Sequence, residues 1–404
     1  MIGALTLALV VVSAPPSDHV APPSDDVAPP SDDGAPPSDV TLVVFSRHAP
    51  RALAVDGERC RARSLAREPG VARLVVDEGD AVRACDADGA CARAARVTVA
   101  CDGPLTLTLA SQEPRALGAQ IDVTARAGAL RVVARVPLED YTAGVVASEL
   151  AHDEPAALGA LSVVARTYAE RARVAPRHDD AMLCDLTHCQ VMRTTAARAA
   201  AREAAHRTAG RVLTTREGAV APVFHHAACG GATVDARALW PDAAHGPIVG
   251  VVDHDASGTP YCAASPHARW RSELGDVDAA RVISREIGRP LDAPSLSLAP
   301  RDDDGFAFVV GDSAGEHTLS GAQLVRAIGR AHGWSTLKSQ RFVVERAGRT
   351  LVFRGEGFGH RVGLCQEGAR ARARAGASTD EILRAYFPRL VVRARGAASK
   401  EAVR

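Results

Sequence analysis

The chain has no excess of charge of either sign. Its 404 residues carry 48 Lys and Arg against 48 Asp and Glu. A strong field of one sign, which would draw the protein to nucleic acid or to an anionic membrane, is therefore excluded. Aromatic residues are also scarce, at 4%. A hydrophobic core must rest mainly on Ala, Val and Leu, and the length is sufficient for two or three domains.

The N-terminal apolar run, residues 2–14, is shorter than the ~20 residues that a transmembrane helix needs. It ends in small residues, as secretory signal peptides do. However, no basic residues precede it, and Pro15 disfavours cleavage at that point. We expect residues 1–14 to be a signal peptide or an uncleaved membrane anchor, with a misassigned start as the alternative.

Residues 15–39 form a linker rich in Pro and Asp. Because Pro pairs favour extended polyproline conformation and the Asp residues repel one another, a semi-rigid tether is expected. A disordered tail without that role is the alternative. An apolar start followed by such a spacer fits an exported protein of the cell wall, the periplasm or the outer face of the membrane. Copies of A-P-P-S-D begin at Ala14, Ala21, Ala28 and Ala35.

The nine cysteines favour an oxidising compartment. Four of them cluster in the N-terminal region and could form two disulfides, although the pairing cannot be deduced from sequence. Because the total is odd, at least one thiol is unpaired or bound to something else. The N-terminal four are Cys60, Cys85, Cys91 and Cys101, and the later five are Cys184, Cys189, Cys229, Cys262 and Cys365.

Hydrophobic periodicity predicts an α+β fold, without the regular βαβ alternation of a parallel sheet. We expect a β-rich N-terminal region at 40–124, one large α+β unit with a substrate cleft at 125–392, and a disordered tail at 393–404. Strands are predicted at 41–45, 72–76, 95–101, 105–110, 130–136, within 211–235, at 306–311 and at 341–354. Helices are predicted at 137–150, 155–174, 277–288, 321–332 and 379–386.

Glu149 is the first candidate for chemistry. In a helix over 137–150 it continues the apolar face of Leu138, Tyr141 and Val145. A carboxyl group that is partly desolvated, at the negative end of a helix dipole, favours its protonated form. Such an acid is what cleavage of a glycosidic bond requires. A solvated residue at a frayed helix end is the alternative.

A second group, His178, Cys184, His188 and Cys189, has the spacing H-x5-C-x3-H-C. Two His and two Cys suit a closed tetrahedral zinc site, although adjacent ligands are unusual. A disulfide between the two cysteines, or two free thiols, would use the same residues. A cysteine nucleophile is a third kind of chemistry to weigh, because histidines precede both Cys229 and Cys365.

Five motifs in order resemble the SpoIID/LytB family of sporulation and cell-wall proteins. The family pattern around its acid is roughly V-P-L-E-x-Y-L-x-G-V-V-x-x-E-M-P, and its closing motif is G-x-G-x-G-H-G-V-G-M-S-Q-Y-G-A. The segments here are VPLEDYTAGVVASELA (136–151) with ALGALSVVARTYAERA (157–172), CDLTHCQVM (184–192), TAGRVLT (208–214), HAACGGATVDARALWP (226–241), and GEGFGHRVGLCQEGA (355–369) with ILRAYFP (382–388).

The resemblance implies a lytic transglycosylase acting on peptidoglycan glycan strands, with Glu149 as general acid and base. The substrate's own 6-hydroxyl would be the nucleophile, which explains why a single carboxylate suffices. Zinc, held by the His/Cys group, would be structural and not required for the chemistry. Substrate-binding residues implied by the motifs are Arg166, Tyr168, Gly230, Gly231, His360 and Gln366.

Departures from the family pattern keep two rival functions open. Arg361 stands where the family has Gly, Cys365 where it has Ser, and Glu367 where it has an aromatic residue. One alternative is a non-catalytic wall-binding protein that enhances an N-acetylmuramoyl-L-alanine amidase. The other is a cysteine-dependent peptidoglycan peptidase. Expected partners are peptidoglycan glycan strands and a cell-wall amidase, without nucleic acid, and with membrane contact only through the N-terminal segment.

Overall fold

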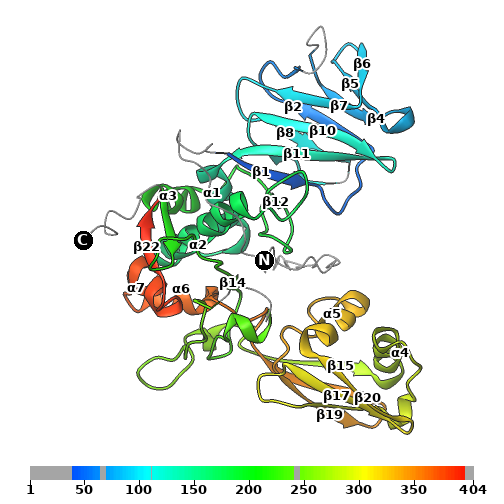
Figure 1. The fold of residues 1–404 in the computed structure, drawn as a ribbon, viewed down its shortest axis with the longest axis vertical. Helices are drawn as coiled ribbons and strands as arrows, with labels where there is room; N and C mark the ends of the chain where they lie inside the picture. The colour runs from blue at the N-terminus through cyan, green and yellow to red at the C-terminus, as the bar shows by residue number, and fades with distance from the viewer. Residues whose placement is uncertain (1–38, 64–69, 111, 241–245, 396–404) are drawn as a thin grey trace, which may run out of the picture.

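The computed structural model describes residues 39–63, 70–110, 112–240 and 246–395. The predicted leader, nearly all of the Pro-rich linker and most of the predicted tail lie outside these residues. Within them no helix is both long and apolar enough to cross a membrane. The predicted α+β class is confirmed. Figure 1 shows a β-rich unit, a central unit with several helices, and a third unit of strands and two helices.

The N-terminal unit consists of two six-stranded sheets, which face each other across a shared core. One has the order β12-β1-β11-β10-β7-β3 and the other β6-β5-β4-β2-β8-β9. The strands are β1 (Asp39–Val44), β2 (Ala52–Asp56), β3 (Arg61–Ala62), β4 (Arg73–Val76), β5 (Val82–Cys85), β6 (Cys91–Ala94), β7 (Arg96–Ala100), β8 (Thr106–Thr108), β9 (Arg115–Ala116), β10 (Gln120–Arg126), β11 (Ala129–Pro137) and β12 (Leu183–Cys184).

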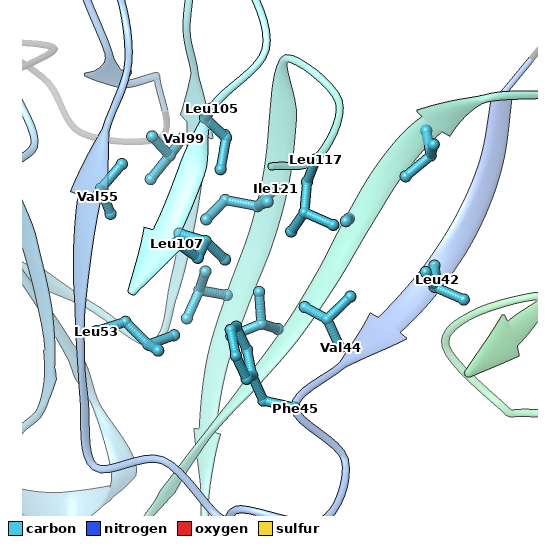
Figure 2. Close-up of a cluster of buried hydrophobic side chains, with 14 of the residues drawn as sticks. Leu42, Val44, Phe45, Leu53, Val55, Val99, Leu105, Leu107, Leu117 and Ile121 are labelled. Atoms are coloured by element: carbon cyan, nitrogen blue, oxygen red, sulfur yellow. The ribbon is translucent and has the colours of Figure 1, made fainter. Parts of the chain in front are cut away.

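Alternation of apolar side chains builds this core, as Figure 2 shows. Leu53 comes from one sheet, and Val99 and Ile121 from the other, and all three are buried. A residue every second position faces inward along a strand, so Val and Leu fill the space that aromatic residues would otherwise occupy. The four N-terminal cysteines form the disulfides Cys60–Cys101 and Cys85–Cys91.

The central unit surrounds α2, whose middle is buried on nearly all sides. As Figure 1 shows, the C-terminal elements α6, α7 and β22 return to lie beside α2 and β13. Pro155 at the first turn of α2 leaves no intrahelical hydrogen bond unmade. The elements are α1 (Leu138–Glu149), α2 (Pro155–Val174), α3 (Ala199–Arg207), β13 (Arg211–Thr214), β14 (His225–His226), β21 (Leu364–Cys365), α6 (Gln366–Arg374), α7 (Thr379–Tyr386) and β22 (Val391–Ala394).

The third unit has its own core, which contains most of the large aromatic side chains of this part of the chain. Phe308, Phe342 and Phe353 pack there against one another. Its last strand leads directly into the Gly-rich closing motif. The elements are β15 (Arg269–Gly275), α4 (Asp276–Ile287), β16 (Ser297–Pro300), β17 (Ala307–Asp312), β18 (Gly315–Ser320), α5 (Gly321–His332), β19 (Phe342–Ala347) and β20 (Thr350–Glu356).

The structure differs from the sequence-based prediction at several points. The boundary drawn at 124/125 falls inside β10, and the range 125–392 contains a separately packed unit at 269–356. Within 211–235 only short strands form. Helices α3 and α6 were not predicted, because their buried faces consist largely of small residues that give no apolar period. Gln366 begins α6.

Arg166 connects three of the central elements. Its guanidinium donates to Glu139 of α1 at 2.9 Å, to the Ala205 carbonyl of α3 at 3.0 Å and to the Arg211 carbonyl of β13 at 3.2 Å. The side chain is completely buried. A cation in this position is compensated by one carboxylate and by carbonyl dipoles, as buried charges require.

We predict that Arg166→Met lowers the free energy of unfolding by about 3 kcal/mol, because Glu139 and two carbonyls lose their donor. Arg207→Met is the matched control. Arg207 forms an exposed pair with Glu203 one helical turn away, and its loss should cost less than about 0.5 kcal/mol. Urea unfolding followed by circular dichroism measures both. Equal costs for the two variants would contradict the structural role of Arg166.

Candidate functional site

Glu149 is the last residue of α1, and its carboxylate is bound from two directions. Its Oε1 accepts the Val191 N–H at 3.3 Å, and its Oε2 accepts from the Gln366 amide nitrogen at 3.1 Å. The side chain is half-buried. One donor comes from the loop after the His/Cys group and the other from the start of α6. The carboxylate therefore stands where two distant segments of the chain meet.

The local sequence explains this position. Leu138, Tyr141 and Val145 of α1 are buried, and Glu149 follows one turn later, so the predicted stripe is confirmed. The helix ends there because Leu150 adopts an extended backbone with φ −121° and buries its side chain. The Leu150 N–H still bonds to the Val146 carbonyl at 3.0 Å. The end of α1 is thus well defined, and Glu149 is not frayed.

Gln366 bridges Glu149 to His225. Its amide nitrogen lies 3.1 Å from Glu149 Oε2 and 3.1 Å from His225 Nδ1. With both amide protons donated, His225 Nδ1 is the acceptor and its ring proton is on Nε2. His225 was not among the predicted site residues. The signal that could have found His225 is the His-His pair formed with His226, the first residue of the motif HAACGG.

The two segments are held together by parallel pairing of β14 with β21, in which His225 pairs with Leu364 and His226 with Cys365. Gly230 and Gly231 allow the following turn to pack against the closing motif. Their φ values are +70° and +106°. A Cβ at Gly230 would lie 2.9 Å from the Glu356 Cβ. These glycines therefore shape the site through backbone geometry.

His360 lies in a group of rings with Phe224, Trp240 and His226, at centroid distances of 6.1, 5.5 and 5.7 Å. Its Nδ1 accepts the Val362 N–H at 3.0 Å. Burial, with a smaller effect of His225, lowers the pKa of His360 to about 3. The ring is therefore neutral near pH 7, with its proton on Nε2. Trp240, from the W-P pair of the fourth motif, also belongs to this region.

Three other residues of the motifs face inward. Arg166 contacts Glu139 and carbonyl groups. Tyr168 packs between the core of the N-terminal unit and the core of the central unit, where burial raises the pKa of its hydroxyl. Arg361 is buried, donates to the Cys229 carbonyl at 3.1 Å, and pairs with Asp304 at 3.2 Å. Arg361 thus braces the glycine turn from inside.

The His/Cys group comes together in the loop that follows α2. Cys189 Sγ lies 3.5 Å from Cys184 Sγ, 3.6 Å from His178 Nε2 and 3.5 Å from His188 Nδ1. Ligand atoms around a tetrahedral zinc stand about 3.5–3.8 Å apart. The spacing therefore fits a Cys₂His₂ zinc site, in which zinc would hold both sulfurs as thiolates. The four residues named from the sequence lie together in the structure.

Comparison with known proteins finds similarity to one group of proteins. Residues 126–215 match the SpoIID model, described as Stage II sporulation protein. A Stage II sporulation protein D of Bacillus subtilis (strain 168) is 26% identical over 309 residues, which cover 69% of this chain and 83% of the relative. The chain is thus similar to SpoIID proteins, most clearly over residues 126–215.

Two further relatives differ in how much of this chain they match. A Stage II sporulation protein D of Bacillus amyloliquefaciens is 29% identical over 276 residues, covering 63% of this chain and 74% of the relative. An amidase enhancer of Bacillus subtilis (strain 168) is 27% identical over 143 residues, covering 30% of this chain and 20% of that protein. The family-model match includes Glu149 and the His/Cys group, whereas Gln366 lies beyond it.

We predict that Gly230→Ala destabilises the site more than Gly210→Ala does. Both glycines have φ +70°, so both substitutions carry the left-handed penalty of about 1 kcal/mol. Only at Gly230 would the new methyl meet other atoms within 4 Å, including the Gly357 nitrogen at 3.1 Å. The clash should add about 1–3 kcal/mol. Unfolding by urea measures the difference, and indistinguishable costs would contradict the close approach of the two segments.

Proposed function

We propose that this protein is a peptidoglycan lytic transglycosylase, with Glu149 as its general acid and base. The relatives named above indicate a role connected with the cell wall. The observation that carries the finer proposal is the placement of one half-buried carboxylate, held by the Val191 N–H and by Gln366 where two distant motifs meet. Motif residues also donate to Glu139 and Asp253, but each of these carboxylates is paired with an arginine, Arg166 and Arg372 respectively.

The reaction needs two proton transfers, the first from Glu149 and the second to it. Protonated Glu149 donates its proton to the oxygen that links N-acetylmuramic acid to N-acetylglucosamine, and the C1–O bond breaks. The muramoyl 6-hydroxyl bonds to C1 and closes the 1,6-anhydro ring. Its proton passes to the Glu149 carboxylate, which restores the acid. No water is consumed, so the carboxylate acts first as acid and then as base.

Other carboxylates near Glu149 in sequence or space are bound to arginines. Asp153 pairs with Arg198 at 2.8 Å. Glu154 pairs with Arg370 at 3.3 Å. Ordinary glycosidases use two carboxylates, of which one acts as nucleophile or activates water. Asp153 and Glu154 already form ion pairs with arginines. A mechanism in which the substrate supplies the nucleophile is therefore favoured over hydrolysis.

Gln366 and His225 position the acid. The amide nitrogen of Gln366 fixes Oε2 of Glu149, and Oε1 is fixed by the Val191 N–H. The carboxyl group is therefore held in one orientation before substrate arrives, which lowers the entropic cost of proton transfer. The Gln366 amide carries no charge that would compete for the proton.

The proposed zinc site at His178, Cys184, His188 and Cys189 has a structural role. Directly after Cys189, Gln190 accepts the buried Tyr141 hydroxyl at 3.1 Å. The next residue, Val191, donates to Glu149. A metal at this site would supply a cross-link within the loop. The loop's own residues then hold the end of α1 and orient the carboxylate.

A second candidate function is enhancement of a cell-wall amidase without catalysis. It is favoured by the similarity to an amidase enhancer. The departures at Arg361 and Glu367 are compatible with it, because both change the closing motif. Arg361 is turned inward, however, and leaves the contacts of Glu149 intact. Cysteine catalysis finds little support, since Cys229 and Cys365 are both completely buried.

We predict that Glu149→Gln abolishes formation of anhydro products, with a rate loss of about 10²–10⁴. The full chain is incubated with intact and amidase-stripped peptidoglycan, and the soluble products are analysed by mass spectrometry. Anhydro ends are lighter than reducing ends by one water. Asp153→Asn is the control, because its exposed carboxylate lies in the next loop, and its activity should be retained.

Reducing-end products from the native chain would replace the proposal with ordinary hydrolysis. Absence of products on both substrates, together with retained binding to glycan, would favour the amidase-enhancer function. Equal activity of the native chain and Glu149→Gln would exclude Glu149 as the acid.

We also predict that the Cys184→Ser, Cys189→Ser double variant loses one zinc equivalent per chain and unfolds at a temperature lower by more than about 5 °C. Zinc is measured by elemental mass spectrometry after dialysis. Thr187→Ala, an exposed change in the same loop, is the control and should keep its zinc. Unchanged zinc content in the double variant would contradict this site.

A further inference from the structure

We propose a second, buried zinc site formed by His226, Cys229, Cys262 and Cys365, beneath the loop that carries Gln366. The Nε2 of His226 and the sulfurs of Cys229 and Cys365 all lie within 4.8 Å of one another. Cys262 Sγ, in the short 3₁₀ helix Tyr261–Ala264, lies 3.7 Å from Cys229 Sγ. One nitrogen and three sulfurs form the Cys₃His set of structural zinc sites.

His226 has the chemistry of a ligand that lacks its metal. Its ring is buried, and Nδ1 donates to the Val362 carbonyl at 3.1 Å. Nε2 is therefore unprotonated, and among the described residues it has no hydrogen-bond partner. Histidines that bind metal regularly donate their second ring N–H to a carbonyl in this way. A buried acceptor without a donor costs about 1–3 kcal/mol, which a metal would remove.

The sulfurs are surrounded by backbone donors. Cys365 Sγ accepts the Cys229 N–H and the Gly368 N–H, each at 3.3 Å, and Cys229 Sγ accepts the Gly231 N–H at 3.3 Å. Sulfur atoms around tetrahedral zinc stand about 3.8 Å apart, close to the 3.7 Å between Cys229 and Cys262. His226, Cys229 and Cys365 already form a close group, and metal binding would require Cys262 to close on that group.

The charge of such a site is compensated. Three thiolates and Zn²⁺ carry one negative charge, and their thiol protons leave to solvent when the metal binds. The buried guanidinium of Arg361 donates to the carbonyl of Cys229 and supplies a positive charge beside it. Asp253, which accepts from the Cys229 thiol at 3.3 Å, keeps its partners Tyr386 and Arg372 at 2.8 Å each. Arg361 stands where the family pattern has Gly. The positive charge that the proposed site needs gives a reason for this arginine.

A disulfide between Cys229 and Cys262 is the competing arrangement. It would use two sulfurs and leave the His226 Nε2 buried without a hydrogen-bond partner among the described residues. The metal accounts for all four side chains at once. It would also tie β14, the glycine turn and the 3₁₀ helix to Cys365, whose sulfur caps α6 at the residue before Gln366. The site therefore positions the partner of Glu149.

Zinc is the metal to use as probe, and the full chain carrying Cys184→Ser and Cys189→Ser is the protein to use. This chain lacks the first proposed site and leaves the second cluster unaltered. Prepared under reducing conditions and loaded with zinc, it should retain one equivalent after dialysis. Loaded with Co²⁺, it should show strong thiolate-to-metal absorption, and zinc X-ray absorption should report three sulfurs and one nitrogen.

Added to that chain, His226→Asn should lower the retained zinc at least tenfold. His332→Asn is the matched control, because His332 Nε2 also lacks a partner among the described residues but belongs to no cysteine group. Its zinc should stay near one equivalent. The metal content is independent of any activity on glycan, so a failed transglycosylase assay leaves this test intact.

No retained zinc in the parent double variant, with its fold intact by circular dichroism, would overturn the proposal. So would a Cys229–Cys262 disulfide found by peptide mapping of unreduced protein. Equal zinc loss in the His226 and His332 variants would remove His226 from the ligand set and overturn the site as proposed.

Discussion

The site depends on one short pairing, the parallel contact of β14 with β21. It joins residues 225–226 to residues 364–365, about 140 positions apart. Only with this pairing in place can Gln366 reach both Glu149 and His225. A two-residue ladder is weak by itself, so it must be reinforced by its surroundings. The buried arginine Arg361 and the glycine turn supply that reinforcement.

The same logic explains why the chain concentrates unusual residues around a single carboxylate. The loop after the His/Cys group fixes one oxygen of Glu149, and the start of α6 fixes the other. Each of these segments carries histidine and cysteine side chains close enough to share a metal. Cross-links of that kind stabilise irregular backbone that has little secondary structure of its own. Glu149 is thus held between two segments that such cross-links would stiffen.

Much of the fold could be predicted from periodicity. Helices over 155–174 and 321–332 have the predicted bounds, because Pro155 and the capping Ser320 mark their starts. Helix α6 was not predicted, because its buried residues, Gln366, Gly368 and Ala369, give no apolar stripe. The separate packing of residues 269–356 was not predicted either. Its elements were mostly expected, but periodicity does not say which elements share a core.

The sequence alone was enough to single out Glu149, the four residues of the His/Cys group and the ordered motifs, because residue type and local spacing carry that information. It could not reveal that Arg166 and Arg361 face inward, or that His225 completes the contacts of Gln366. Those facts depend on contacts between segments 27 to 141 residues apart, which no local pattern records. Likewise, the gathering of His226, Cys229, Cys262 and Cys365 was decided only when tertiary packing brought three separate segments to one point.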